Sequence, residues 1–569
     1  MFIKFKKDVS SVLEEALRKL EFEAESLMLE GSAHADIASS VAYGLASKYK
    51  KNPVGIAKQI YEAIIVPENS LIGEVTIKGP YINFNTNRRY LIDTIYEIRS
   101  GIKAEPKGHL ILEHTSANPN GPLHVGHIRN SCLGDTLGRI LRRAGYDVDV
   151  QYYVNDMGRQ MAIVVWAADH YGLDPNKKTD HAIADAYIEA NRALKENPEL
   201  VAEIDVLMQK VENGDSEVCT RFSENVGLAV DGIKATLKRM NISHDRFVNE
   251  SSFIRDGSVQ EIMDAIKKTD CLSEEEGALV VDLSDSGFEK GLVVGRSNNT
   301  SLYVTRDLAY HKWKAQQAER NIDILGADHK LISSQLRATL RLIGVQEPEV
   351  VIFEFVSLPE GSMSTRAGKF ISADELLDKI EEQAYIEVNK RRDDITEAEM
   401  RNIARIVGIG AVRYDIIRIS PDKSTVFDWN AALDFEKQGA PFIQYSHTRA
   451  GAIIRNAKAQ GCALAEAETG CGLGSDVLAL LTETQEVALI KTLARFMDVI
   501  DNAAESLKAH SVATYAREVA ESFNQFYRDS PVLSAEGDVR AARLCLVECS
   551  RIILGEMLEV LGIEAPESM

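Results

Sequence analysis

The sequence NPNGPLHVGHIRNSCLGD (Asn118–Asp135) lies between two apolar runs, HLILEH (His109–His114) and YDVDVQYYV (Tyr146–Val154). The flanking runs are typical of buried strands, and the apolar residues between them recur at helical spacing. Gly145 supplies a stop signal for that helix. We therefore predict a strand–helix–strand unit within a parallel sheet.

Two histidines, His124 and His127, stand where the predicted helix begins, with Gly126 between them. Open parallel sheets bind ligands at the carboxyl ends of their strands, and the first N–H groups of a helix attract anions. The pattern thus predicts a phosphate site. Taken alone, it is equally compatible with two surface histidines beside a helix-start glycine.

The composition is that of a globular protein with several domains. The chain has 569 residues, of which 45% are hydrophobic and 27% charged, and this length predicts three or four domains. It contains no apolar run of membrane-spanning length, and the first residues, MFIKFKKDVSS, lack the apolar centre of a signal peptide, so we expect a cytoplasmic protein. Seven scattered cysteines fit a reducing compartment. Cys545 and Cys549 lie one helical turn apart on an apolar stripe, which favours core positions over metal ligands.

A net charge of −21 argues against a generally basic surface, but nucleic-acid binding depends on local patches. The segment 437–460 has basic and aromatic residues and no carboxylate, a combination that suits RNA backbone and unstacked bases. Its members are Lys437, Phe442, Tyr445, His447, Arg449, Arg455 and Lys458. The alternative is a solvated helix face with Tyr445 in the core.

The distribution of patterns predicts a multidomain α/β protein. Residues 1–97 read as a small α+β unit, and residues 105–372 as a parallel-sheet domain with a largely helical insertion at about 169–295. Strand-like pieces, GALVVDLSD and GLVVGRSNNTSLYVTRD, resume near the end of that insertion. Residues 373–435 and 436–569 are almost entirely helical in pattern, so we predict a connecting helical region and a C-terminal all-α bundle.

Several motifs together carry a resemblance that covers nearly the whole chain. They are EHTSANPNGPLHVGH, YYVNDMGRQ, YVTRDLAYH, LGADHK, GSMSTRAGKF, QYSHTR and a helical C-terminal region ending in LGIEAPESM. In this order they resemble arginyl-tRNA synthetases, which are class I aminoacyl-tRNA synthetases. The resemblance implies a Rossmann-like catalytic domain, an N-terminal domain that contacts tRNA, and a C-terminal anticodon-binding bundle.

The resemblance also implies the reaction and its participants. Arginine and ATP form arginyl-adenylate and pyrophosphate, and arginine is then transferred to its tRNA with release of AMP. The expected partners are L-arginine, ATP with accompanying Mg²⁺, and arginine tRNA. No permanently bound cofactor, resident metal or membrane is expected, and the chain is expected to be a monomer.

Site residues follow from the same resemblance. His124 and His127 are expected to stabilise phosphate charge, and Gly126 to leave a flat surface for adenine. A guanidinium requires carboxylate oxygens, and the positions that match the family's arginine-binding residues are Glu113, Ser116, Asn118, Tyr303 and Asp307. Tyr303 and Asp307 stand four residues apart, which places them on one face if a helix begins there. Two of these residues have a structural alternative: Asp307 as an N-cap or first-turn acid of a helix, and Glu113 as a surface strand end.

The remaining ATP contacts are expected from Asp328 and His329, unless these form only a structural turn. In the second phosphate loop the sequence departs from the family's Lys-Met-Ser-Lys-Ser pattern. The loop residues are Ser362, Met363, Ser364 and Thr365, and the nearest cations, Arg366 and Lys369, are assigned to pyrophosphate or, alternatively, only to the solvated surface. For tRNA, the expected contacts are Tyr445, His447, Arg449 and Lys458.

Two other functions compete with an active ligase. The first is an RNA-binding paralogue that has lost catalysis, which the missing loop lysines favour. The second is a nucleotidyl transferase for a small metabolite, which shares the His-x-Gly-His chemistry but has no use for a long helical C-terminal region.

Overall fold

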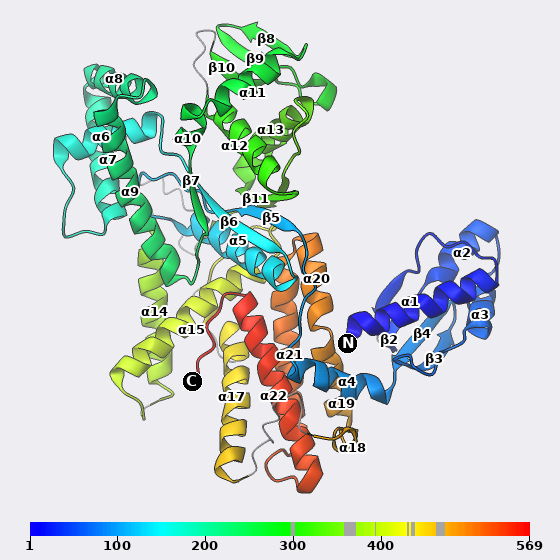
Figure 1. The fold of residues 1–569 in the computed structure, drawn as a ribbon. Helices are drawn as coiled ribbons and strands as arrows, with labels where there is room; N and C mark the ends of the chain where they lie inside the picture. Colours follow the sequence, from blue (N-terminus) through cyan, green and yellow to red (C-terminus); the bar gives the residue numbers. More distant parts are fainter. Residues whose placement is uncertain are drawn as a thin grey trace.

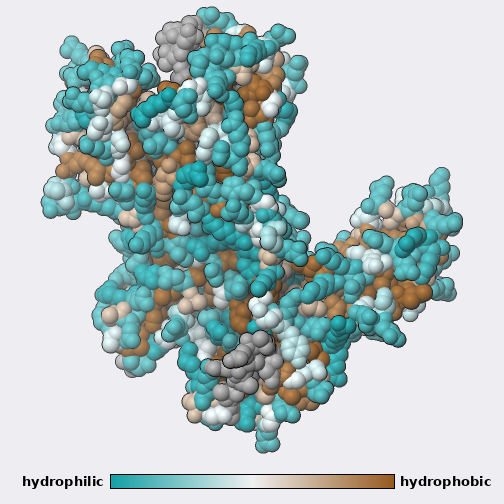
Figure 2. Space-filling view, viewed as in Figure 1, coloured by the Kyte–Doolittle hydropathy of each residue, from teal (hydrophilic) through white to brown (hydrophobic). Residues whose placement is uncertain are grey.

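A computed structural model describes residues 1–32, 34–296, 302–357, 371–392, 394–428, 432–433, 439–461 and 473–569. Figure 1 shows a central sheet with helical lobes above it, a helical body below it, and an N-terminal unit that projects to one side. In the space-filling view the N-terminal unit joins the body through a narrow waist (Figure 2). The molecule is therefore built from several distinct parts, as predicted.

The N-terminal unit is an antiparallel sheet covered by helices. Its elements are α1 (Phe2–Lys19), β1 (Leu29–Ser32), β2 (Ala35–Ser39), α2 (Val41–Tyr49), α3 (Pro53–Ala63), β3 (Ile72–Lys78) and β4 (Tyr81–Thr86), with strand order β1-β2-β4-β3. Phe5, Ile56, Ile82 and Phe84 are fully or almost fully buried in a core of its own. The predicted α+β character is thus confirmed.

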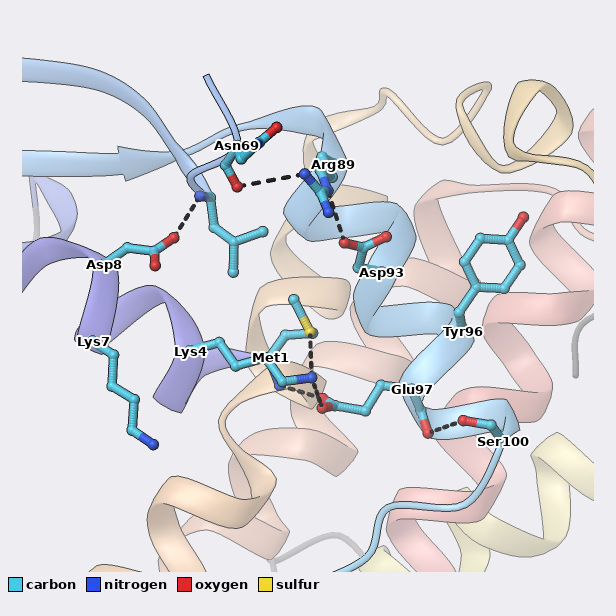
Figure 3. Close-up of a pocket in the computed structure, with 11 residues that line it drawn as sticks. Met1, Lys4, Lys7, Asp8, Asn69, Arg89, Asp93, Tyr96, Glu97 and Ser100 are labelled. Carbon is cyan, nitrogen blue, oxygen red and sulfur yellow. Dashed lines mark hydrogen bonds and ion pairs between the residues drawn. The ribbon is translucent and has the colours of Figure 1, made fainter. Parts of the chain in front are cut away.

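Helix α4 (Arg88–Arg99) connects this unit to the rest of the molecule. A cavity of about 720 Å³ lies where α1 meets α4 (Figure 3). Charged groups around it pair with one another: Lys4 Nζ lies 3.0 Å from Glu97 Oε1, and Arg89 Nε lies 3.2 Å from Asp93 Oδ2. None of the predicted site residues lines this cavity, which marks a joint between two parts of the fold.

Five parallel strands form the central sheet, in the order β12-β11-β5-β6-β7. They are β5 (His109–Glu113), β6 (Asp147–Val154), β7 (Arg246–Asn249), β11 (Arg320–Gly326) and β12 (Glu349–Phe353). Leu112 of β5 is fully buried and pairs with Val150 of β6 on one side and with Ile322 of β11 on the other. β5 is an apolar strand because both of its faces are covered.

Helix α5 (Val125–Arg143) connects β5 to β6, so the predicted strand–helix–strand unit is confirmed. Gly145 follows it with a φ of +100°, and a Cβ atom there would lie 2.1 Å from the carbonyl oxygen of Glu105, so only glycine fits. The strand order reverses between β5 and β11. In sheets of this type, ligands bind at the carboxyl ends of the strands beside such a reversal.

The segment between β6 and β11 is more varied than the predicted helical insertion. It contains α6 (Arg159–Tyr171), α7 (Thr179–Glu196), η1 (Pro198–Leu200), α8 (Val201–Glu212), α9 (Ser216–Arg239), α10 (Glu250–Arg255), α11 (Ser258–Lys267), β8 (Leu272–Glu275), β9 (Ala278–Val281), η2 (Ser284–Ser286), β10 (Leu292–Arg296) and α12 (Tyr303–Gln317). Strand β7 of the main sheet and an antiparallel sheet, β10-β9-β8, interrupt the helices. The strand-like pattern that we extended through Asp307 ends before Tyr303, where α12 begins.

Helices dominate the described chain after β12. These helices are α14 (Ala373–Asn389), α15 (Glu397–Ile417), α17 (Ala440–Ala459), α18 (Ser475–Leu478), α19 (Thr484–Ala494), α20 (Phe496–Ser506), α21 (Ala509–Asp529) and α22 (Gly537–Val560). Two further helices, η3 (Ala327–His329) and α13 (Lys330–Leu342), connect β11 to β12. Two short strands, β13 (Val356–Ser357) and β14 (Thr425–Val426), pair in parallel. In the lower body of Figure 1, α17 packs against α21 and α22. Cys545 and Cys549 are fully buried in α22, which confirms their assignment to the core.

The face seen in Figure 2 is largely hydrophilic, with hydrophobic residues scattered between polar ones. Within the part of the chain that the structure describes, no helix is both long enough and apolar enough to cross a membrane.

Candidate active site

The loop that follows β5 is fixed to its neighbours at an unusual backbone turn. Thr115 and Ser116 both have positive φ, +70° and +40°, a conformation that side chains other than glycine rarely adopt. The Thr115 amide donates to Asn130 Oδ1 of α5 at 2.8 Å, and Ser116 Oγ accepts from the Tyr153 amide of β6 at 3.0 Å. The strained turn is thus held from two sides.

His124 and His127 form a compact pair at the start of α5. The Gly126 amide donates to His124 Nδ1 at 3.1 Å, and the His124 amide donates to His127 Nδ1 at 3.3 Å. The two imidazole rings stack with centroids 3.7 Å apart. Both side chains therefore cap the helix start through their Nδ1 atoms.

These contacts determine what the two rings offer to a ligand. Burial lowers the pKa of His124, and burial together with the charge of His124 lowers the pKa of His127 to about 3. Both rings are therefore neutral near pH 7, and because each Nδ1 accepts a hydrogen bond, the ring proton resides on Nε2. Two Nε2–H donors thus stand beside the positive end of the α5 dipole, which suits an anion.

The chain on either side of residues 358–370 is anchored to this same helix. On the far side, His124 forms an isolated antiparallel bridge with Ser372, and the Ala373 amide donates to the Leu123 carbonyl at 2.7 Å. Ser372 also caps α14, because its Oγ accepts from the Glu375 amide at 3.1 Å. The predicted loop residues Ser362, Met363, Ser364, Thr365, Arg366 and Lys369 lie outside the described residues.

Arg129, one turn into α5, fixes the near side. Its guanidinium is 1% exposed and donates to backbone carbonyls, among them those of Glu354 at 2.6 Å and Lys423 at 2.9 Å. These carbonyls flank the pairing strands β13 and β14. One helix therefore holds both the histidine pair and the two ends of the segment that carries the second predicted phosphate loop.

Asp307 and Tyr303 lie on the first turns of α12. Because α12 runs antiparallel to β11, its start lies at the carboxyl edge of the sheet. Asp307 is half-buried, and burial together with the charges of Glu250 and Glu113 raises its pKa well above the ordinary value. Leu302 is the N-cap of α12 and the first turn holds no acidic residue, so Asp307 is neither an N-cap nor a first-turn acid. Tyr303 is 63% exposed.

Glu113 is buried at the end of β5, so the surface alternative is wrong. Its Oε2 lies 2.8 Å from the ammonium of Lys314, a side chain with 0% exposure, and its Oε1 accepts from Ser116 Oγ at 3.0 Å. Lys314 also lies 2.6 Å from Asp323 Oδ1, and His311 Nε2 lies 2.8 Å from Asp323 Oδ2. The Lys314 and His311 charges hold the pKa of Asp323 well below its ordinary value.

This cluster is not arranged for a metal. Glu113, His311 and Asp323 have metal-ligand spacing, but the ammonium of Lys314 already lies between the two carboxylates. A second group, Asp180, His181 and Asp374, is filled in the same way by Lys178 Nζ, 3.0 Å from Asp180 Oδ2 and 2.7 Å from Asp374 Oδ2.

The other predicted substrate residues are exposed at the carboxyl edge. Asn118 donates to Gln160 Oε1 at 2.9 Å and accepts from Asn155 Nδ2 at 2.6 Å. Asp328 and His329 lie in η3, directly after β11, and their side chains are more than half exposed. All three are therefore accessible to a ligand above the sheet.

Helix α17 carries the four predicted RNA residues with different accessibility. Tyr445 is 42% exposed, so it is not a core residue, and the Arg449 guanidinium lies 4.5 Å from its ring centroid. His447 is half-buried against α22, and burial together with the charge of Arg551 lowers its pKa to about 4. Lys458 is exposed in the last turn.

Three residues of this site escaped our sequence reasoning. Ser372 had a usable signal, because Ser372-x-x-Glu375 is a capping-box pattern. Arg129 had none, since its partners are carbonyls distant in sequence. Tyr153 stood in a quoted motif, but its environment depends on packing between β6 and α12.

Comparisons with known proteins agree with this architecture. Residues 93–429 match the family described as tRNA synthetases class I (R), catalytic domain. Residues 4–86 match the arginyl tRNA synthetase N terminal domain, and residues 443–569 match the DALR anticodon binding domain. The arginine--tRNA ligase of Methanosarcina barkeri is 57% identical and aligns over 100% of both chains. The chain belongs to the arginyl-tRNA synthetase family.

Other relatives of the family extend the comparison. The arginine--tRNA ligase of Methanococcoides burtonii is 54% identical, again over 100% of both chains. Among solved structures, arginyl-tRNA synthetase from Thermus thermophilus superposes with a TM-score of 0.83 at 28% identity, covering 99% of this chain and 100% of that one. The enzyme from Plasmodium falciparum, at 16% identity and a TM-score of 0.81 with 99% of each chain covered, shares the fold.

Proposed function

We propose that this chain is an arginine--tRNA ligase that works through an adenylate. A carboxylate oxygen of L-arginine attacks the α-phosphorus of ATP, and the bond to pyrophosphate breaks. A hydroxyl of the terminal ribose of tRNA then attacks the arginyl carbonyl, and AMP leaves. The protein's task in the first step is to position the reactants and stabilise charge on the phosphates.

The observation that carries this proposal is the carboxylate of Asp307. Within the described part of the chain, no cationic side chain pairs with it, although it is half-buried near other carboxylates. An acid in such surroundings gains most from a cation that arrives with a ligand. A guanidinium meets this need because it stays charged and presents parallel N–H donors.

The neighbouring charges support a cationic ligand. Lys314 lies between Glu113 and Asp323, His311 lies against Asp323, and Glu250 is neutralised in part by Arg306, 3.3 Å away, whereas no described cation pairs with Asp307. The site therefore keeps an excess of negative charge. Each Glu113 oxygen already accepts one hydrogen bond and has a lone pair left for a second.

Residue roles follow from these positions. We assign Tyr303, Asp307, Glu113, Ser116 and Asn118 to arginine. We assign the Nε2–H groups of His124 and His127 to the phosphates of Mg²⁺-bound ATP, Gly126 to adenine, and Asp328 and His329 to the ribose or base. Arg366 and Lys369, with the loop 362–365, are assigned to pyrophosphate.

For tRNA we assign α17, with Tyr445 and Arg449 as the base-contacting pair and Lys458 as a backbone contact. The exposed ring of Tyr445 and the guanidinium over it form a stacking platform of the kind that unpaired bases use. His447 is placed behind this pair. We further propose a monomer that acts in the cytoplasm.

The deciding experiment is arginine-dependent exchange between ATP and pyrophosphate, measured with and without arginine tRNA. Exchange that requires arginine is the expected result. If arginine and tRNA together support neither exchange nor charging while tRNA still binds, the chain is an RNA-binding paralogue instead.

A further inference from the structure

Tyr153 is a buried tyrosine whose hydroxyl is unpartnered within the part of the chain that the structure describes. It lies near the end of β6, is 5% exposed, and its ring stacks on that of Tyr310 with centroids 4.5 Å apart. The Tyr310 hydroxyl donates to Gln151 Oε1 at 2.8 Å, whereas the Tyr153 hydroxyl forms no hydrogen bond with any described residue. Buried hydroxyls are normally paired, because an unpaired one costs free energy.

The surroundings of this hydroxyl point to its use. Burial and the charges of Asp307, Glu250 and Glu113 raise the pKa of Tyr153 well above the ordinary value, and the charge of Arg306 opposes them. Two of these carboxylates already have a cation, since Glu250 pairs with Arg306 and Glu113 with Lys314. Tyr310, on which the Tyr153 ring stacks, follows Asp307 by three residues on α12. The hydroxyl therefore belongs to the part of the site where Asp307 has no cationic partner among the described residues.

We propose that the Tyr153 hydroxyl is a specificity-determining group that accepts a hydrogen bond from the guanidinium of arginine. This inference rests on the proposed function. A guanidinium carries five N–H donors in a plane, and one carboxylate satisfies only two of them. A neutral oxygen beside that carboxylate takes a further donor, while its own proton is directed to a carboxylate. The ammonium of lysine is a compact point charge and does not present donors in this arrangement.

This role accounts for the unpaired state in the ligand-free protein. A rigid donor–acceptor group that is already desolvated needs no reorganisation when the ligand arrives, so its burial cost is offset only in the complex. Stacking on Tyr310 holds the ring in place for this purpose.

The test is Tyr153→Phe, which keeps the ring and removes only the hydroxyl. We expect the KM for arginine in ATP–pyrophosphate exchange to rise about tenfold to a hundredfold, as for the loss of a hydrogen bond to a charged group. The KM for ATP should stay within twofold of the wild-type value. The inhibition constant of L-lysine, measured in competition with arginine, should also change by less than twofold. The Tm of the ligand-free variant should equal or exceed that of the wild type, because an unpaired buried hydroxyl has been removed.

Tyr515→Phe is the matched control. Tyr515 is also buried, in the helical body, but its hydroxyl donates to the Thr492 carbonyl at 2.8 Å. Its removal should lower the Tm and leave the KM for arginine unchanged. The pair of variants therefore separates the loss of a structural hydrogen bond from the loss of a ligand contact.

The outcomes are distinct from those that test the function itself. An active wild type whose Tyr153→Phe variant keeps the wild-type KM for arginine overturns the role of Tyr153 and leaves the proposed function standing. A lowered Tm with equal increases in the KM for arginine and ATP assigns Tyr153 to structure and also overturns it. If the wild type shows no arginine-dependent exchange with tRNA present, the proposed function itself fails.

Discussion

At the scale of single residues, Asp307 makes the clearest prediction. In Asp307→Asn the guanidinium loses its countercharge, so the KM for arginine should rise about a hundredfold while that for ATP stays nearly constant. Steady-state exchange kinetics measure both constants. Equal damage to the two would indicate a general positioning role.

The raised pKa of Asp307 also predicts a pH dependence. Its ionised form is disfavoured in the ligand-free fold, so Asp307 favours folding at low pH and this contribution is lost as pH rises. In the proposed complex the guanidinium of arginine pairs with the ionised carboxylate, which reverses the preference, so arginine binding should release a proton. We therefore expect the affinity for arginine to fall on acidification in the wild type and to become flatter in Asp307→Asn. Burial also raises the pKa of Glu250, to about 7. Calorimetry in buffers of different ionisation enthalpy measures the proton release.

The histidine pair gives a second residue-scale prediction. His124→Ala or His127→Ala should raise the barrier to adenylate formation by roughly 2–4 kcal/mol, as for the loss of a catalytic hydrogen-bond donor. His109→Ala, at the opposite end of β5, is the control and should leave the rate unchanged.

Because the pKa of His127 is lowered to about 3, this group should destabilise the fold as pH falls from about 6.5 towards 3. Chemical denaturation across that pH range measures this loss of stability. In the kinetic test, near-wild-type turnover of a variant that carries both His124→Ala and His127→Ala would reject their catalytic role.

At the scale of elements, α5 carries the histidine pair at its start and, through Arg129, holds the chain that precedes residues 358–370. Arg129→Met removes a buried guanidinium and leaves several backbone carbonyls without its N–H donors, so it should destabilise the protein by roughly 3 kcal/mol. It should also raise the KM for ATP more than that for arginine. Arg142→Met on the same helix removes a half-exposed ion pair with Asp245 and should cost less than about 1 kcal/mol. Denaturation curves of both variants measure the difference, and equal stability losses would contradict the anchoring role.

Elements also show how far sequence reasoning reached. The β5–α5–β6 unit was predictable because its apolar pattern is local and its glycine stop is required by geometry. Strand β7 was missed because four residues carry too little periodicity to stand out between helices. The start of α12 was read as strand because Tyr303, Val304 and Thr305 favour strands, whereas packing places them in a helix. The pairing of Glu113 with Lys314 joins residues that only the fold brings together.

At the scale of the whole molecule, the tRNA contacts proposed for α17 predict effects on charging that are separate from adenylate chemistry. Tyr445→Ala should weaken charging of arginine tRNA by roughly 1–3 kcal/mol, as for a lost base stack, without affecting exchange at saturating tRNA. Its exposed position predicts little change in Tm. Lys458→Ala should weaken all tRNAs alike and flatten the salt dependence, because a phosphate contact carries no base information. Charging assays with cognate and non-cognate tRNA at several salt concentrations distinguish the two variants. A large loss of Tm in Tyr445→Ala with unchanged tRNA discrimination would show that Tyr445 has no role in recognition.

The central claim is that a site for a guanidinium and a site for ATP phosphates meet at the carboxyl edge of one sheet. The most direct measurement is ATP–pyrophosphate exchange in the presence of arginine tRNA, with arginine, lysine or no amino acid, in the wild type and in Asp307→Asn. We predict exchange with arginine alone in the wild type, and its restoration in Asp307→Asn only at much higher arginine concentration. Exchange that is indifferent to the amino acid, or an Asp307→Asn variant that saturates at the wild-type arginine concentration, would contradict the claim.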